Sequence, residues 1–358
     1  MNTVAPFIRP RPLRRVVALG GGSRLPAVLA GLRRHLPRDC RITAVVTAAD
    51  DGGSSGILRR QYGVLPPGDV RNCLIALARV APEVRAALQC RLSVSSGPEH
   101  ALGNLLLTAL DIVATDEIAA IRLAASLLGI EDVILPSTTA RVNLVADLAD
   151  GRRVRGESAI PRSGARVVRL MLDPANATPA AGVLAAIDAA DLVVLGPGSF
   201  YTSILAALIV PGIAEAVVAT QALKIFVCNL MTEPGETDGF GVAAHLDALR
   251  AHGLPPEALD FVALNDAPIP QKALARYVAQ GAQPVSADFA VSAVGPLVVT
   301  ADLLAPGPIV RHDHDKVGRF LCAIADAEGR EPEDELQSPA GDDHDADRID
   351  PVAINLAR

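Results

Sequence analysis

Residues 16–25 read VVALGGGSRL, and this stretch decides the fold class. The residues from Val16 to Leu19 are apolar, three glycines follow, and apolar side chains then recur at helical spacing from Leu25 onward. This order predicts a strand, a glycine turn and a helix. Residues 41–47 predict the next strand, and a strand–helix–strand unit of this length implies parallel pairing through a right-handed crossover.

Strands followed by polar loops return in the second half of the chain, at residues 192–195, 225–229 and 261–265. Between the two halves, residues 70–130 show helical spacing, and residues 133–173 alternate apolar and polar side chains as antiparallel strands do. We therefore expect an α/β fold that is Rossmann-like and doubly wound. Its mostly parallel sheet would carry a helical insertion at about 70–130 and a small antiparallel side sheet at about 133–173.

The composition suits buried parallel strands covered by helices, because half of the 358 residues are hydrophobic and only 3% are aromatic. We expect one domain at residues 16–325, between a flexible basic arm at 1–15 and an acidic tail at 326–358. Eleven acids against three arginines predict that this tail is disordered. Five widely spaced cysteines without a CxxC pair indicate neither disulfides nor a zinc site.

No apolar run reaches the roughly 18 residues of a membrane span, and the N-terminus does not read as a signal peptide. We therefore expect a cytoplasmic protein with no membrane span and no nucleic-acid partner. A homodimer is one option for its assembly.

Residues 47–73 read TAADDGGSSGILRRQYGVLPPGDVRNC and predict a polar loop system that binds an anion. Gly52 and Gly53 let the backbone approach a ligand closely, and Ser54 and Ser55 offer hydroxyl and amide groups to phosphate oxygens. The segment is therefore a candidate for one wall of a diphosphate site.

Asp50 and Asp51 are adjacent, so at a strand end their side chains face opposite ways, and at most one should point into the crevice. That one is the leading candidate for a catalytic carboxylate. It could bind a Mg²⁺ ion that bridges a diphosphate, or orient a hydroxyl. The alternative is an Asx turn that caps its own backbone. The sequence HDHD at residues 312–315 reads as exposed charge at the start of the last helix rather than as a metal site.

Asp69 stands just before a helical pattern, where it would be a natural N-cap. Arg71 and Asn72 follow in the first turn, and an arginine there opposes the helix dipole, which favours an anionic ligand beside them. His100 and Asn104 open another apolar helix. Each of these two could hydrogen-bond a ligand or cap the helix.

The first glycine turn resembles half of a dinucleotide fingerprint, since Gly20 and Gly22 match its first two glycines while Leu25 stands at the third. The N-terminus of the following helix would present free amides and a positive dipole end to a phosphate. The alternative is a turn that merely requires glycine. The candidate phosphate contacts are Gly20, Gly21, Gly22, Ser23 and Arg24.

The segment LGPGSFYTS at residues 195–203 repeats the order of strand, glycine turn and helix. Its candidate contacts are Gly196, Gly198, Ser199 and Tyr201, and the alternative is a cap made by Ser199 with Tyr201 packed in the core. The loop NLMTEPGETD at 229–238 follows another strand and could contact ribose or sugar hydroxyls, or could simply be solvated. Its candidates are Asn229 and Thr232, with Glu233, Glu236 and Thr237 as further hydroxyl contacts.

Together these motifs resemble one family, the gluconeogenesis factors of the YvcK type, in the group that also contains the 2-phospho-L-lactate transferases of the CofD type. The resemblance covers nearly all of residues 16–325. It depends on the ordered set GGGSRL, TAADDGGSSGILRRQYGVLPPGDVRNCLIALA, HALGNLLL, LGPGSFYTSI and CNLMTEPGETDG. It implies a Rossmann-like cytosolic protein that binds a nucleotide-sugar, with UDP-N-acetylglucosamine as the expected ligand. It also implies links to cell shape, wall synthesis and growth on gluconeogenic carbon sources, with no reaction generally assigned.

The transferase branch implies a different activity, the transfer of a phospholactyl-type group from a guanylyl diphosphate donor to a deazaflavin with Mg²⁺. Our first hypothesis is therefore a nucleotide-sugar-binding regulatory factor. The second is a Mg²⁺-dependent phospholactyl- or phosphoenolpyruvyl-type transferase with Asp50 or Asp51 at the metal. A nicotinamide dehydrogenase is a weaker third, because the third glycine is missing.

One residue departs from the family pattern. Arg24 stands where the family usually has glycine, and it could obstruct the close backbone approach to a ligand or replace it with a charge contact.

Overall fold

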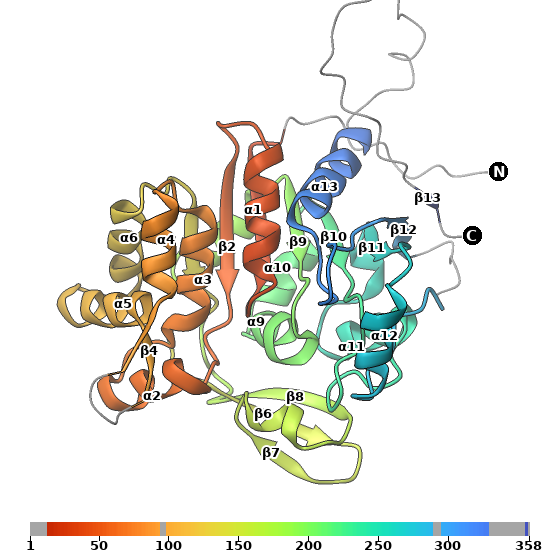
Figure 1. Cartoon of the computed structure of the whole chain (residues 1–358), viewed down its shortest axis with the longest axis horizontal. Helices are drawn as coiled ribbons and strands as arrows, with labels where there is room; N and C mark the ends of the chain where they lie inside the picture. The colour runs from red at the N-terminus through yellow and green to blue at the C-terminus, as the bar shows by residue number, and fades with distance from the viewer. Residues whose placement is uncertain (1–12, 94–97, 289–294, 329–354, 357–358) are drawn as a thin grey trace, which may run out of the picture.

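The centre of the computed structural model, which describes residues 13–93, 98–288, 295–328 and 355–356, is one large sheet (Figure 1). Its strands in spatial order are β13 (Asn355–Leu356), β12 (Leu297–Ala301), β11 (Phe261–Asn265), β10 (Leu223–Val227), β9 (Leu192–Leu195), β1 (Arg15–Gly20), β2 (Arg41–Val46) and β5 (Val133–Pro136). All neighbours pair in parallel except β13, which is antiparallel to β12. The predicted doubly wound α/β fold is confirmed.

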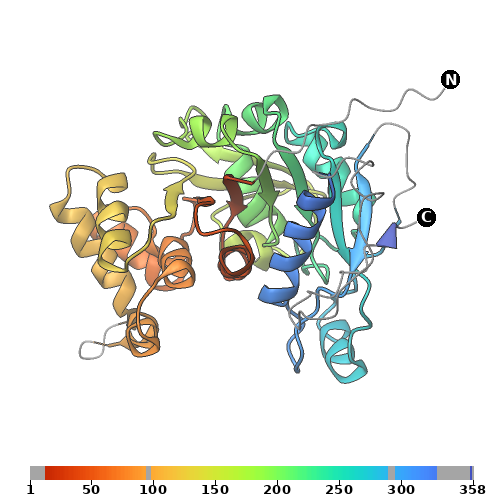
Figure 2. The same ribbon diagram turned by 90° about the horizontal axis from the view of Figure 1, so that it is seen from above.

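Alternate residues of the strands enter two separate cores, one on each face of the sheet. On β1, Val16 and Ala18 belong to one core, and Val17 and Leu19 belong to the other. Helices α1 (Leu25–His35) and α13 (His314–Glu328) lie on the first face, and α8 (Val183–Asp188), α10 (Ile213–Ala219) and α11 (Val242–Ala251) lie on the second (Figure 2). Because helices cover both faces, these strands are apolar throughout rather than alternating.

Helices α1 and α13 touch through glycine. A Cβ on Gly31 would lie 1.9 Å from the carbonyl oxygen of His314, and one on Gly318 would lie 2.3 Å from the carbonyl carbon of Gly31. This close approach fixes the start of α13, and with it the preceding segment at residues 310–312, against the helix that follows the first glycine turn.

The insertion after β2 is helical, but it begins earlier than predicted. It contains α2 (Gly53–Tyr62), α3 (Pro67–Leu77), α4 (Pro82–Gln89), α5 (Leu102–Val113) and α6 (Glu117–Leu127), with a short hairpin of β3 (Arg91–Leu92) and β4 (His100–Ala101). The prediction of a continuous loop system at 47–73 is wrong over α2, because residues 57–62 are mostly good helix formers. Gly63, at φ +70°, ends that helix in the left-handed conformation.

The side sheet is antiparallel, as predicted, and consists of β6 (Asn143–Leu148), β7 (Arg153–Arg155) and β8 (Val167–Asp173). A short helix, α7 (Ala159–Arg162), follows β7. The predicted start of this sheet at residue 133 is wrong, because residues 133–136 form β5 and pair in parallel with β2. That strand is short, apolar and mostly buried, which is typical of a parallel strand covered on both faces.

The predicted basic arm and acidic tail lie mostly outside the described residues. Within the tail, residues 326–328 belong to the end of α13 and residues 355–356 form β13, so the expected disorder does not hold for these residues. Among the described helices, none is by itself long and apolar enough to cross a membrane, although the bent pair Phe200–Leu208 and Ile213–Ala219 together meets the criteria of length and composition.

Candidate functional site

The two glycine turns meet where the strand order reverses. The chain runs from β1 outward to β2 and β5, returns to β9 on the other side of β1, and continues outward to β10, β11 and β12. The carboxyl ends of β1 and β9 therefore border the crevice in which doubly wound folds bind ligands. The turns are in contact, since a Cβ on Gly198 would lie 3.7 Å from the carbonyl oxygen of Gly21.

The first turn requires glycine at two positions, for lack of space at Gly21 and for backbone conformation at Gly22. Gly22 adopts φ +67°, and a Cβ on Gly21 would lie 2.6 Å from Cγ2 of Thr47 and 2.7 Å from Oδ2 of Asp69. The amide of Gly22 donates a hydrogen bond of 2.8 Å to Oδ2 of Asp69. Ser23 is exposed beside this bond. The turn thus donates to a carboxylate on one side, and on the other side it leaves Ser23 exposed to solvent.

Asp69 is not the N-cap that the sequence predicted. Helix α3 begins at Pro67 with Pro66 at the N-cap, so Asp69 lies within the first turn and its carboxylate points across to Gly22. Proline at the first helical position needs no amide partner, which lets the helix start three residues earlier than predicted. Burial raises the pKa of Asp69 to about 6, against the lowering effect of its bond from Gly22.

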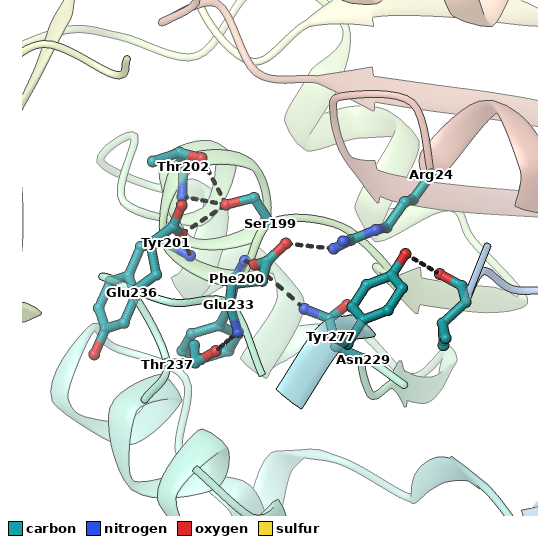
Figure 3. A network of polar contacts seen from close by, with 11 residues as sticks. Arg24, Ser199, Phe200, Tyr201, Thr202, Asn229, Glu233, Glu236, Thr237 and Tyr277 are labelled. Atoms are coloured by element: carbon teal, nitrogen blue, oxygen red, sulfur yellow. Dashed lines mark hydrogen bonds and ion pairs between the residues drawn. The ribbon is translucent and has the colours of Figure 1, made fainter. Parts of the chain in front are cut away.

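The second turn is filled by the protein's own side chains (Figure 3). It leads into a π-helical segment, η1 (Phe200–Leu205), with Ser199 at the N-cap accepting a hydrogen bond of 3.3 Å from the amide of Thr202. The Ser199 hydroxyl also donates to Oε2 of Glu236 at 2.6 Å. The capping alternative for Ser199 is therefore the one that the structure shows.

Two glutamates from the loop after β10 accept hydrogen bonds from the first amides of η1. Oε2 of Glu236 accepts from the amide of Tyr201 at 3.3 Å, and Oε2 of Glu233 accepts from the amide of Phe200 at 3.2 Å. Burial, followed by the charge of Glu233, raises the pKa of Glu236 to about 7. In the structure both carboxylates bond the helix N-terminus, whose free amides favour an anion, and a contact with sugar hydroxyls stays a prediction.

Of the two interpretations of Tyr201, the structure shows the one in which the side chain packs in the core. Its side chain is 2% exposed, its hydroxyl donates to the carbonyl oxygen of Val167 at 3.1 Å, and its ring packs edge-on against Phe200. A large aromatic ring gains more from the core than from the crevice.

Five candidate residues of the insertion form one hydrogen-bonded chain. The Ser54 hydroxyl lies 2.8 Å from Nδ1 of His100 and accepts from Nδ2 of Asn104 at 3.0 Å. Arg71 donates to Oδ1 of Asn104 at 2.8 Å and to Oδ1 of Asn72 at 2.7 Å. The sequence predicted that these residues share a site, and the structure brings them together from α2, α3, β4 and the start of α5. Whether they contact a ligand stays a prediction.

Asp50 and Asp51 face opposite ways, as expected from their adjacency. Oδ1 of Asp50 accepts from the amide of Gly52 at 2.9 Å, which is the predicted Asx turn, and burial raises the pKa of Asp50. Oδ1 of Asp51 accepts from both the amide and the hydroxyl of Ser158, at 2.9 and 2.7 Å. Asp51 therefore ties the side sheet to the insertion, and Asp50 is the better of the two catalytic or metal candidates.

A third carboxylate, Glu157, joins this region from the segment after β7. Its Oε2 lies 3.9 Å from the position of a Cβ on Gly52. Burial and then neighbouring carboxylates raise its pKa to about 8; these neighbours are Asp50, Asp51, Asp69 and Glu236. Nothing in the sequence singled it out, because it stands among the residues of the predicted side sheet. Within the described part of the chain, no group of three or more metal-binding side chains is close enough to hold an ion by itself.

A cavity of about 170 Å³ lies beside the first turn, bordered by Arg24, the loop at 229–234, helix α12 (Gln271–Val278) and residues 310–312. Asn229 and His312 are 3% and 5% exposed, and Oδ1 of Asn229 and Nε2 of His312 have no hydrogen-bond partner among the described residues. Burial, followed by the charge of Arg24, lowers the pKa of His312 to about 3, so the imidazole is neutral. The prediction that residue 312 carries exposed charge is wrong.

Tyr277 and Thr232 complete this cavity. The Tyr277 hydroxyl donates to the carbonyl oxygen of Val310 at 3.4 Å, which closes one side (Figure 3). The backbone of Thr232 donates to the carbonyl oxygen of Gln283 at 2.7 Å, and its hydroxyl accepts from the Gln283 amide at 2.9 Å. Thr232 therefore stiffens the wall, while Asn229 and His312 offer it unused polar atoms.

Comparison with known proteins agrees with this architecture. The model of the family described as 2-phospho-L-lactate transferase CofD matches residues 16–304. The gluconeogenesis factor of Bacillus subtilis is 39% identical over 313 residues, covering 87% of this chain and 98% of that protein. The gluconeogenesis factor of Listeria monocytogenes is 37% identical over 321 residues, covering 89% and 98%.

A solved structure shows the same fold. The crystal structure of protein BH3568 from Bacillus halodurans has a TM-score of 0.82 and 37% identity, and the match covers 87% of this chain and 99% of that one. The chain therefore belongs to the 2-phospho-L-lactate transferase CofD family, in which it is similar to proteins named gluconeogenesis factors.

Proposed function

We propose that this protein binds a nucleotide-sugar, with UDP-N-acetylglucosamine as the first candidate, and acts as a regulatory factor rather than through turnover. The observation that carries the proposal is the pair of touching glycine turns at the strand-order switch, next to a cavity of about 170 Å³ with two buried unpartnered polar atoms. In this proposal the diphosphate would lie at the turns and the nucleobase would enter the cavity, where Asn229 and His312 would provide its hydrogen-bond partners.

Thermal-shift titration tests this directly. UDP-N-acetylglucosamine should raise the melting temperature more than UDP, GDP or NAD, because a ligand that binds only the folded state stabilises it by mass action. Asn229→Ala should reduce the shift, and Arg122→Ala, an exposed change on α6, is the matched control. No shift from any nucleotide at saturating concentration would overturn the proposal.

A second candidate, Mg²⁺-dependent transfer of a phosphorus-containing group, is favoured by the crowding of Asp50, Asp69 and Glu157. Buried carboxylate oxygens suit Mg²⁺, which usually completes its shell with water and substrate phosphates. Since these side chains do not by themselves form a metal-binding group, phosphate oxygens of the ligand would have to share the ion. When bound, Mg²⁺ would neutralise charge on the diphosphate, and Arg71, which lies close enough to Asp69 to affect its pKa, would add a positive charge beside it. Metal-dependent nucleotide release that Asp50→Asn abolishes would support this candidate.

The relatives' name, gluconeogenesis factor, supports a role in growth on gluconeogenic carbon sources, and the resemblance of the sequence motifs implies a role in cell shape and wall synthesis. We propose a cytoplasmic protein, with a homodimer as one option, that is needed for growth on gluconeogenic carbon sources and for cell shape and wall homeostasis. Deletion of the gene should slow growth on a gluconeogenic carbon source and alter cell shape, and unchanged growth and shape would contradict this part.

A further inference from the structure

Glu233 is held by three hydrogen-bond donors of the kinds that hold a phosphate. Nη1 of Arg24 donates to its Oε1 at 2.5 Å, and the amide of Phe200 and Nδ2 of Asn229 donate to its Oε2 at 3.2 and 3.5 Å (Figure 3). A guanidinium, an amide at a helix N-terminus and a side-chain amide together favour an anion. A carboxylate from 209 residues away along the chain therefore stands where a phosphate oxygen would be bound.

We propose that Glu233 is a built-in, displaceable occupant of the anion site, and that a pyrophosphate-bearing ligand binds by taking Arg24 and the Phe200 amide from it. The inference rests on the proposed nucleotide-sugar site and names the regulation of that site. It assigns a role to Arg24, the residue at which this chain departs from its family: it pairs with Glu233 when the site is empty and with phosphate when it is filled.

Glu233 differs from its neighbour Glu236 in how firmly it is held. Glu236 is 3% exposed and is bonded by the Ser199 hydroxyl and the Tyr201 amide, so removing it would leave buried donors without partners. The Glu233 side chain is 19% exposed, and that of its partner Arg24 is 41% exposed. A partly exposed ion pair contributes little to stability, so this one opens easily.

Displacement needs only the side chain to turn. The amide of Glu233 donates to the Thr237 hydroxyl at 2.8 Å, and the amide of Gly235 donates to Oδ2 of Asp238 at 2.8 Å. A Cβ on Gly235 would lie 2.3 Å from the carbonyl oxygen of Pro161, so the loop backbone is packed against α7, which lies between β7 and β8 of the side sheet. The loop therefore stays in place while the carboxylate leaves.

The geometry also links the two parts of the proposed site. Arg24, Asn229 and Glu233 all line the cavity beside the first turn, and Glu233 at the same time bonds the second turn. A ligand whose base enters the cavity would bring its phosphates to Arg24. While the Glu233 carboxylate stays in place, its negative charge repels those phosphates and leaves neutral ligands unaffected. The ion pair of Arg24 and Glu233 therefore weakens the binding of phosphate-bearing ligands selectively.

Calorimetric titration with inorganic pyrophosphate, UDP and uridine tests the proposal on four proteins: wild type, Glu233→Gln, Arg24→Gln and Glu257→Gln. Glu257 forms a more exposed pair with Arg250 at 2.7 Å, with its side chain 39% exposed, and serves as the control for removing a carboxylate from an ion pair away from the site. Glu233→Gln should bind pyrophosphate and UDP about fivefold more tightly than wild type, because only the phosphates compete with the carboxylate. Its affinity for uridine should be unchanged. Arg24→Gln should weaken the binding of pyrophosphate and UDP, and Glu257→Gln should bind all three ligands with the affinity of the wild type.

The outcomes separate this inference from the function on which it rests. If Glu233→Gln binds pyrophosphate no better than wild type, or if neither protein binds it, the displaceable carboxylate is excluded. If pyrophosphate responds as expected while no nucleotide or nucleotide-sugar binds, the inference stands and the proposed function fails. If Glu233→Gln weakens uridine as well, Glu233 is a ligand contact and not a competitor. Glu233→Ala gives a second reading of the same prediction should the glutamine variant fold poorly.

Discussion

The two glycine turns share the order of strand, glycine and helix, but their amides are used differently. The first turn binds one carboxylate, Asp69 at Gly22, and leaves Ser23 exposed. The second turn is capped by Ser199 and bonded by Glu233 and Glu236. The shape of such a turn is therefore set locally, whereas residues 33 to 47 positions away decide whether its amides are free for a ligand.

The largest expected difference between the turns concerns glycine itself. Gly21→Ala should destabilise the protein by about 3 kcal/mol, because its Cβ would overlap Thr47 and Asp69. Gly198→Ala should cost far less, since the nearest atom to its Cβ would be at 3.4 Å. Urea unfolding of both variants measures the gap. Equal losses would show that the turns are equally crowded.

The next difference is in pH dependence. The pKa of Glu236 is raised to about 7 and that of Asp69 to about 6, in both cases mainly by burial. A carboxyl whose pKa is raised on folding contributes stability that is fully present below its unfolded pKa and is lost as the pH rises through its folded pKa. Between pH 5 and pH 8 the free energy of unfolding of the wild type should therefore fall by about 2 kcal/mol relative to that of Glu236→Gln. Relative to that of Asp69→Asn it should fall by about 1 kcal/mol.

Free energies of unfolding from urea titrations at pH 5 and pH 8 check both values. Glu257→Gln, at an exposed ion pair, is the control for the general effect of removing a carboxylate. If the difference in free energy of unfolding between wild type and each variant does not change with pH, these carboxyls ionise in the folded protein as they do in the unfolded chain.

The smallest difference concerns the two serines. Ser199→Ala should destabilise the protein by about 1 kcal/mol, because it removes a helix cap. Ser23→Ala should leave stability unchanged. If the first turn binds the diphosphate, this variant should also bind UDP more weakly. Thermal unfolding and calorimetry on the two variants make the comparison. A loss of stability for Ser23→Ala alone would reverse the roles given to the two turns.

The parts of the fold that depend on local pattern could be predicted from the sequence. VVALGGGSRL and the strand at 192–195 gave the correct strands and turns, because apolar runs that end in glycine leave few alternatives. The adjacency of Asp50 and Asp51 predicted their opposite directions, although both lie in the loop beyond the end of β2, where their hydrogen-bond partners and not strand alternation set these directions.

The contacts that decide how the site works could not be predicted, because they join distant parts of the chain. Glu233, Glu236 and Glu157 reach the turns from loops whose positions depend on packing. The charged neighbours of His312 in the sequence predict an exposed position, yet the side chain is buried beside Arg24 and the loop after β10. Helix α2 was missed because its glycine and serine start resembles a loop.

The most direct test is a crystal structure of the protein with UDP-N-acetylglucosamine. The account predicts a diphosphate on the first glycine turn, in contact with Arg24 and the Phe200 amide, with the Glu233 carboxylate turned away from both. Density for the ligand elsewhere, or in the crevice with the bond between Arg24 and Glu233 intact, would contradict it.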